Sequence, residues 1–117
     1  MFRESLQKII GNCEGAVAGV VMGFDGIAVD TVAQDDEVDV QTIGMEFSFV
    51  LGQVRKAADI LEVGSLEEVS IRSESLTFMI RVLSDDYFVG VAMKPEENFG
   101  KGRFLMRMAV PELREQL

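Results

Sequence analysis

The longest predicted helix of the chain lies in the stretch DVQTIGMEFSFVLGQVRKAADILE, residues 39–62. Asp39 is suited to begin the helix, because its carboxylate can accept hydrogen bonds from the exposed amides of the first turn. Apolar side chains recur along one line of a helical wheel and form the stripe that we expect to face a sheet. The members of this stripe are Ile43, Phe47, Val50, Val54, Ala57 and Leu61. The stretch therefore predicts a long amphipathic helix that covers one face of a sheet.

The opposite side of this helix is less polar than a face that meets only water. The predicted partner surface on that side consists of Gly44, Met45, Ser48, Phe49, Gly52 and Lys56. Gly44, Ser48 and Gly52 repeat every four positions, so another backbone could approach closely, although each glycine is disfavoured in a helix by about 1 kcal/mol relative to alanine. We expect a second copy of this helix or a different protein to bind here. The alternative is that Phe49 is an isolated exposed apolar residue and that Gly44 only marks a bend.

A short helix and two strands precede the long helix. Residues 2–13 carry apolar side chains at spacings of three and four, which predicts a helix with one buried stripe. Residues 16–22 and 27–33 are rich in small and β-branched residues, which favours strands. Asp25-Gly26 between them is a strong signal for a tight hairpin, because these residues tolerate the positive φ that the turn needs.

Three strands and a final helix follow the long helix. The strands are predicted at residues 66–73, 76–83 and 87–94, and the turns between them are short enough for consecutive antiparallel hairpins. The final helix is predicted at residues 100–116, and Pro111 should kink or restart it. Its inner side is expected to carry Phe104, Leu105, Met108 and Ala109.

The elements add up to one fold class. The chain of 117 residues has room for one compact domain, which we place at 1–117. Residues 89–93 are apolar or small throughout, and a strand that is apolar on both faces needs cover on both faces. The sequence therefore predicts an α+β fold: a five-stranded antiparallel sheet with helices on both faces, in the order α-β-β-α-β-β-β-α.

The first of the three later strands offers a second candidate surface. If these strands pair in order, residues 66–73 can lie at an edge of the sheet, and Val69, Ser70 and Ile71 carry no charge that would block pairing. The neighbouring Glu67-Glu68 pair and Arg72 are charges that could protect the edge instead. The sequence leaves a guarded edge and a dimer seam equally open.

The composition excludes several classes of function. The chain has 11 Lys and Arg against 20 Asp and Glu, a formal net charge of −9, so nucleic acids and anionic lipid surfaces are disfavoured partners. It contains no His and one Cys, which removes the commonest acid/base group and any internal disulfide. No apolar run approaches the roughly 18 residues that a membrane span needs. We expect a cytoplasmic protein with no nucleic-acid partner and no membrane insertion.

No group of residues predicts catalysis, a metal site or a cofactor, and we expect none of the three. Adjacent carboxylates occur only in predicted loops or at strand ends, where solvated charge explains them. These pairs are Asp35-Asp36, Glu67-Glu68, Asp85-Asp86 and Glu96-Glu97. Gly100-Lys101-Gly102 lacks the spacing of a phosphate-binding loop. Cys13 lies on the apolar stripe of the first helix and is expected in the core, with no activating base nearby.

The ordered set of segments resembles the roadblock/LC7 family over essentially the whole chain. The segments that carry the resemblance are Gly15-Ala16 at the entry to the first strand, MGFDGI at 22–27, the long glycine-containing helix, LEEVSI at 66–71 and NFGKGR at 98–103. The resemblance implies a non-enzymatic dimer in which the long helices pack together and the third strands join two sheets into one. It also implies work beside small Ras-like GTPases or as a subunit of larger assemblies.

Within that family the chain is most similar to the bacterial stand-alone members of the motility and cell-polarity system. The resemblance implies two kinds of member: some bind the small GTPase directly and stimulate hydrolysis, and others bind a fellow regulator. The first kind carries an additional carboxyl-terminal extension, which favours the adaptor kind for this chain. The leading hypothesis is therefore a homodimeric adaptor in a small Ras-like GTPase switch.

Two other functions stay open at the level of sequence. A direct GTPase-activating partner would have to reshape the switch loops of the GTPase, because Arg55 and Lys56 are more simply explained as a solvated face than as an arginine finger. A small-molecule sensor would need a large apolar pocket inside one protomer. Phe78, Phe88 and Phe104 are expected to fill that space instead.

Overall fold

The structure, a computed structural model, describes residues 2–95 and 98–117, so the predicted carboxylate pair Glu96-Glu97 lies outside the described residues. Within them the helices and strands follow the predicted order α-β-β-α-β-β-β-α. The elements are α1 (Phe2–Gly11), β1 (Ala16–Gly23), β2 (Ala28–Ala33), α2 (Val40–Leu61), β3 (Glu68–Arg72), β4 (Thr77–Val82), β5 (Tyr87–Met93) and α3 (Phe99–Glu115).

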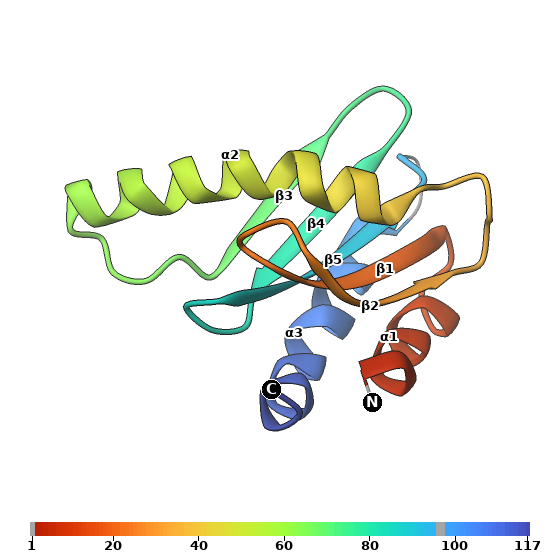
Figure 1. The fold of residues 1–117 in the computed structure, drawn as a ribbon. Helices are drawn as coiled ribbons and strands as arrows, with labels where there is room; N and C mark the ends of the chain where they lie inside the picture. Colours follow the sequence, from red (N-terminus) through yellow and green to blue (C-terminus); the bar gives the residue numbers. More distant parts are fainter. Residues whose placement is uncertain (1, 96–97) are drawn as a thin grey trace.

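The elements form three layers, as Figure 1 shows. The middle layer is a five-stranded sheet with the strand order β2-β1-β5-β4-β3, in which every neighbouring pair is antiparallel. α2 crosses one face of the sheet, and α1 and α3 lie side by side on the other. The predicted α+β fold, with helices on both faces of an antiparallel sheet, is confirmed.

Each face of the sheet has its own apolar core. The side chains of Leu6 and Ile9 from α1 and of Met106 and Leu113 from α3 pack on one face. Val40 and Leu51 from α2 pack on the other face, together with Phe78 and Phe88. The central strands β1, β5 and β4 supply residues to both cores, which explains why these strands are apolar on both sides.

Local hydrogen bonds and backbone conformation set the β1–β2 turn and the two ends of α2 close to the positions predicted from the sequence. In the hairpin between β1 and β2, the amide of Ile27 donates to the carboxylate of Asp25 at 3.0 Å, and Gly26 adopts a φ of 85°. Asp39 caps α2 by accepting from the amide of Thr42 at 3.1 Å. The helix ends at Glu62, whose left-handed φ of 56° turns the chain out of the helix.

The side of α2 that faces the sheet differs from the prediction by roughly a quarter of a turn. The buried residues of α2 are Val40, Gly44, Ser48 and Leu51. Ile43, Phe47 and Val54 flank them and are half-buried, whereas Val50, Ala57 and Leu61, predicted to face the sheet, are exposed. The prediction that one side of α2 packs on the sheet was therefore correct, but the residues assigned to that side were wrong in part.

Small side chains explain this orientation. A Cβ added at Gly44 would lie 3.0 Å from the terminal atoms of Met22 on β1, so glycine allows the helix to sit close to the sheet. The Ser48 hydroxyl, buried beside it, donates to the carbonyl of Met45 at 2.6 Å. The expectation that Gly44 and Ser48 would admit the backbone of a partner is wrong, because their own sheet already covers them.

The inner side of α3 also differs from the prediction. Its buried residues are Gly102, Met106, Val110 and Leu113. The predicted inner residues Phe104 and Met108 are exposed, and Leu105 and Ala109 are half-buried. The cause is Gly102, where a Cβ would lie only 2.7 Å from Met79 and 2.9 Å from Met93, so the glycine turns toward the sheet. α3 continues through Pro111 without the predicted restart.

Candidate partner-binding surface

The side of α2 that points away from the sheet carries several large apolar residues among polar ones. We call the following exposed residues the outer face of α2: Met45, Phe49, Val50, Gly52, Lys56, Ile60 and Leu61. Glu46 and Gln53 are exposed beside them. Phe49 is 71% exposed, Ile60 77% and Leu61 70%. The carboxyl-terminal turns of α2 extend beyond the strands in Figure 1, which leaves their apolar side chains without cover from the sheet. An apolar surface of this kind marks an interaction site more often than isolated exposed residues do.

Of the six residues of α2 that were predicted to bind a partner, four lie on this outer face and two, Gly44 and Ser48, are buried against the sheet. Met45, Phe49, Gly52 and Lys56 are exposed. Nothing lies within 4 Å of the position that a Cβ would take at Gly52, so the helix backbone there is open to a neighbour. The wheel missed Val50, Ile60 and Leu61, because it assigned Val50 and Leu61 to the core and did not consider Ile60.

β3 forms one edge of the sheet, as predicted, and pairs within the described residues only with β4. Val69 and Ile71 are half-buried and lie on the α2 side of the sheet, where they contact the core beneath α2. Ser70, between them, is exposed. α2 packs mainly over β1, β2 and β5, so it covers the far edge of the sheet better than the β3 edge. The β3 edge and the outer face of α2 are therefore both open.

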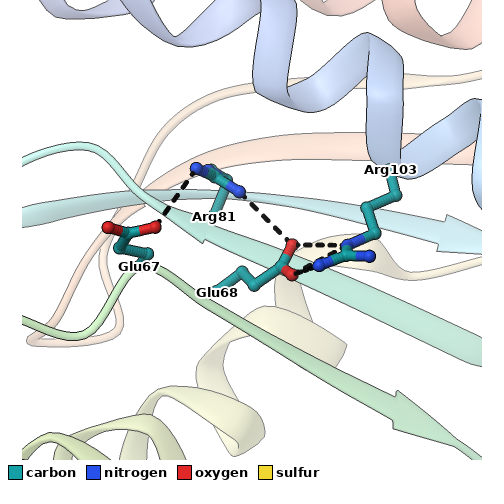
Figure 2. Close-up of polar contacts among 4 residues, drawn as sticks. All are labelled: Glu67, Glu68, Arg81 and Arg103. Carbon is teal, nitrogen blue, oxygen red and sulfur yellow. Dashed lines mark hydrogen bonds and ion pairs between the residues drawn. The ribbon is translucent and has the colours of Figure 1, made fainter.

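Charged residues hold one end of β3 in place (Figure 2). Arg81 of β4 lies between two acids, with ion pairs of 3.7 Å to Glu67 and 3.3 Å to Glu68. Arg103 of α3 meets Glu68 with its side-chain fork, and its Nε lies 2.7 Å from Glu68 Oε1. Hydrogen bonds from Arg103 lower the pKa of Glu68 and raise the pKa of Arg103. The acids thus tie β3 to β4 and α3, on the sheet face opposite α2.

Arg55, the candidate arginine finger, is engaged within the protomer. Its guanidinium lies 3.7 Å from the centre of the Phe24 ring, and its Nη1 donates to the carbonyl of Asp85 at 2.8 Å. The side chain is thus held against the turns that join β1 to β2 and β4 to β5. A finger that reaches into another protein would have to give up both contacts.

The interior is closely packed where a sensor would need space. Phe78 and Phe88 are fully buried, as expected, and a Cβ at Gly90 would lie 2.3 Å from the Phe78 ring. Phe104, the third residue expected to fill this space, lies on the surface instead. Within residues 2–95 and 98–117, no group of three potential metal ligands comes together. In the same residues no helix has the length and apolar character to cross a bilayer.

No model of a known protein family matches the sequence, and no curated protein matches it. Solved structures do match it. A roadblock/LC7 domain from Streptomyces avermitilis has a TM-score of 0.85 at 14% identity, over 97% of this chain and 94% of that chain. The gliding protein MglB from Thermus thermophilus also has a TM-score of 0.85, at 11% identity, over 97% of this chain and 85% of that chain. These two similarities establish the fold.

A third structure is related in sequence as well. MglC from Myxococcus xanthus is 42% identical over 99% of this chain and 98% of that chain, with a TM-score of 0.73. The chain belongs to the roadblock/LC7 family. In this roadblock/LC7 domain, the open β3 edge and the outer face of α2 are two surfaces that the described residues of one protomer leave uncovered.

Proposed function

We propose that this roadblock/LC7 protein is a cytoplasmic, non-enzymatic homodimeric adaptor in a small Ras-like GTPase switch that controls bacterial motility or cell polarity. It acts by binding a fellow regulator. The observation that carries the proposal is the apolar outer face of α2, which combines strong exposure of Phe49, Ile60 and Leu61 with an open edge at β3. Both features support binding to a protein partner, and neither is a site for a substrate.

The physical argument for self-association starts from complementarity under a two-fold axis. Two β3 edges can pair and extend the sheet, because the middle of the strand carries only Val69, Ser70 and Ile71. The α2 helices of the two copies would then lie next to each other on one face of the joined sheet. Their outer faces would cover each other and remove Phe49 from water.

The polar residues on this surface are compatible with such a seam. Gly52 leaves room at the α2 backbone, and Lys56 lies one turn further along the helix. Glu46 and Lys56 both sit on the exposed side of α2, so opposite charges are available to pair across an antiparallel helix contact. Arg72 is exposed and donates to the carbonyl of Pro95 at 2.7 Å, so the charge at the end of β3 is directed back along its own chain.

The adaptor role draws on the relatives. MglC, at 42% identity, and the gliding protein MglB share the fold, and the name of the second ties it to gliding motility. Arg55 supports an adaptor rather than a GTPase-activating protein, because its guanidinium is held by Phe24 and Asp85 of its own chain. The rival function, direct activation of a GTPase, would then require a change in the switch loops of the GTPase itself.

Two measurements test the proposal. Multi-angle light scattering across a concentration series should give twice the mass of one chain. Mixing the purified protein with a GTP-loaded small Ras-like GTPase from the same cells should leave the rate of GTP hydrolysis unchanged. A faster rate would replace the adaptor by the GTPase-activating alternative, and a strictly monomeric protein at high concentration would contradict the dimer.

A further inference from the structure

A groove lined by arginines runs between α3 and the β3–β4 side of the sheet, on the face opposite α2. One part has a volume of about 400 Å³ and is lined by residues that include Arg81, Arg103, Phe104 and Arg107. The adjoining part has a volume of about 470 Å³ and includes Arg81, Arg107 and Arg114. The two parts share Glu67, Arg81 and Arg107, so they form one elongated depression, which we call the arginine groove.

The sequence places three of these arginines on one side of α3. Arg103, Arg107 and Arg114 are spaced by four and seven residues, which aligns them along the helix. Arg81 reaches the groove from β4, and its side chain is only 18% exposed. Residues 94–117 hold five basic and four acidic residues, whereas residues 1–39 hold two basic and eight acidic ones. Its arginines, together with the acids Glu67, Glu68 and Asp85, thus give the groove a net positive lining on an acidic protein.

Part of the positive charge is already neutralised within the protomer. Glu67 and Glu68 pair with Arg81, and Glu68 also pairs with Arg103 (Figure 2). Asp85 lines the far end of the groove without an ion pair among the described residues. These acids account for one part of the groove and leave the part around Arg107 and Arg114 with positive charge to spare.

Arg107 and Arg114 have donors available to a ligand. Within residues 2–95 and 98–117, Arg107 makes no ion pair or hydrogen bond, although it lines both parts of the groove. Arg114 uses its Nε to donate to the carbonyl of Leu83 at 2.7 Å, which fixes the side chain. Among the described residues its terminal nitrogens have no hydrogen-bond or ion-pair partner. A guanidinium held in this way presents two parallel N–H donors that match a carboxylate.

We propose that the arginine groove binds an acidic peptide segment of a partner protein, with carboxylates on Arg107 and Arg114 and an apolar side chain against Phe104. Charge complementarity supports this occupant, because the groove offers unpaired guanidinium groups on a protein whose net charge is −9. Phe104 is 58% exposed beside Arg103 and Arg107, so the groove also offers an apolar contact. A long polyanion is disfavoured, because the acidic remainder of the protein repels it.

The groove and the outer face of α2 lie on opposite sides of the sheet, because α3 lines the groove and α2 covers the other face. The groove does adjoin the β3 edge, since Glu67 and Glu68 line it. The mass of the protein in solution is therefore measured together with peptide binding. Loss of peptide binding with an unchanged dimer mass would identify a failure of the groove alone, and the reverse result would identify a failure of the dimer alone.

The test uses the full chain and a short fluorescein-labelled peptide of alternating glutamates and leucines, with fluorescence anisotropy as the readout. Binding should weaken with added salt, because the contacts are between exposed charges. Arg107→Glu should weaken it by about tenfold or more, since a hydrogen bond to a charged group is lost and a like charge is introduced. The matched control Lys101→Glu makes the same charge change on another side of α3 and should bind like the parent.

Each remaining outcome contradicts the proposal. Equal binding of a peptide with glutamine in place of glutamate would show that the groove does not recognise the negative charge of the peptide. An equal loss in Lys101→Glu would show that only net charge matters. Binding of a phosphopeptide or of anionic vesicles without the glutamate peptide would assign the groove to a different ligand. Arg114→Gln serves as a second variant, and thermal unfolding of each variant checks that the fold is intact.

Discussion

Replacing Phe49 by aspartate tests most directly whether the outer face of α2 binds a second copy of the protein. The side chain is 71% exposed in the protomer, so the fold loses little when it is changed. A partner that covers the helix would bury it. Phe49→Asp should therefore leave the monomer folded and break the dimer, because it removes apolar contact area and places an unpaired carboxylate in the seam.

The size of the effect follows from area. A phenylalanine buries roughly 200 Å² when fully covered, so the 71% that is still exposed corresponds to on the order of 140 Å² per copy. At about 25 cal/mol per Å² this stabilises the contact by about 3.5 kcal/mol per copy, or about 7 kcal/mol for a symmetric pair. If the dimer contact gains only half of this free energy, Phe49→Asp still raises the dissociation constant of the dimer by more than about a hundredfold.

Sedimentation equilibrium over a range of concentrations measures the change. The parent should fit a dimer, and Phe49→Asp should fit a monomer at concentrations where the parent is fully associated. Met108→Asp is the matched control, since Met108 is a large apolar residue with 62% exposure on α3, on the other side of the sheet. A dimeric Phe49→Asp, or equal dissociation in Met108→Asp, would refute the reasoning.

Three further predictions concern stability, each measured by chemical denaturation. Gly44→Leu should destabilise the fold by about 1–3 kcal/mol through overpacking against β1, whereas Gly52→Ala, in open space, should stabilise α2 by about 1 kcal/mol. Gly90→Ala should destabilise strongly, because its Cβ would lie 2.3 Å from an aromatic ring, and a parent-like midpoint would contradict the packing. Glu68→Gln should cost stability at neutral pH but not at strongly acid pH. Arg103 lowers the pKa of Glu68, so this stabilisation is complete above the unfolded-state value near pH 4 and is lost as the pH falls through the lower folded-state pKa.

The sequence predicts the order, type and approximate ends of the elements because those depend on local chemistry. Asp39 and Asp25-Gly26 act through hydrogen bonds to amides within three residues, so their roles could be recognised without the fold. The edge position of β3 follows from short turns that force consecutive strands to pair in order. Such features need no knowledge of what lies across the sheet.

The orientation of the helices could not be predicted in the same way. The wheel treats glycine as neutral, yet Gly44 and Gly102 each turn toward the sheet, because only glycine allows the closest approach of helix to strand. A close contact of this kind depends on which residues of the sheet stand opposite, such as Met22 beneath Gly44 and Met79 beneath Gly102. The periodic pattern of one helix does not contain that information.

The observed orientation of α2 supports binding of a partner more strongly than the predicted orientation did. The prediction gave the helix one apolar stripe for its own sheet and a small opposite patch around Phe49. In the structure Gly44 and Leu51 are buried against the sheet, while Val50 and Leu61 of the predicted stripe are exposed to solvent, as Phe49 is. A helix that carries large apolar residues on its exposed side as well as on its buried side is typical of an element that packs on two sides. The protomer supplies one of those sides, and a second polypeptide is the simplest source of the other.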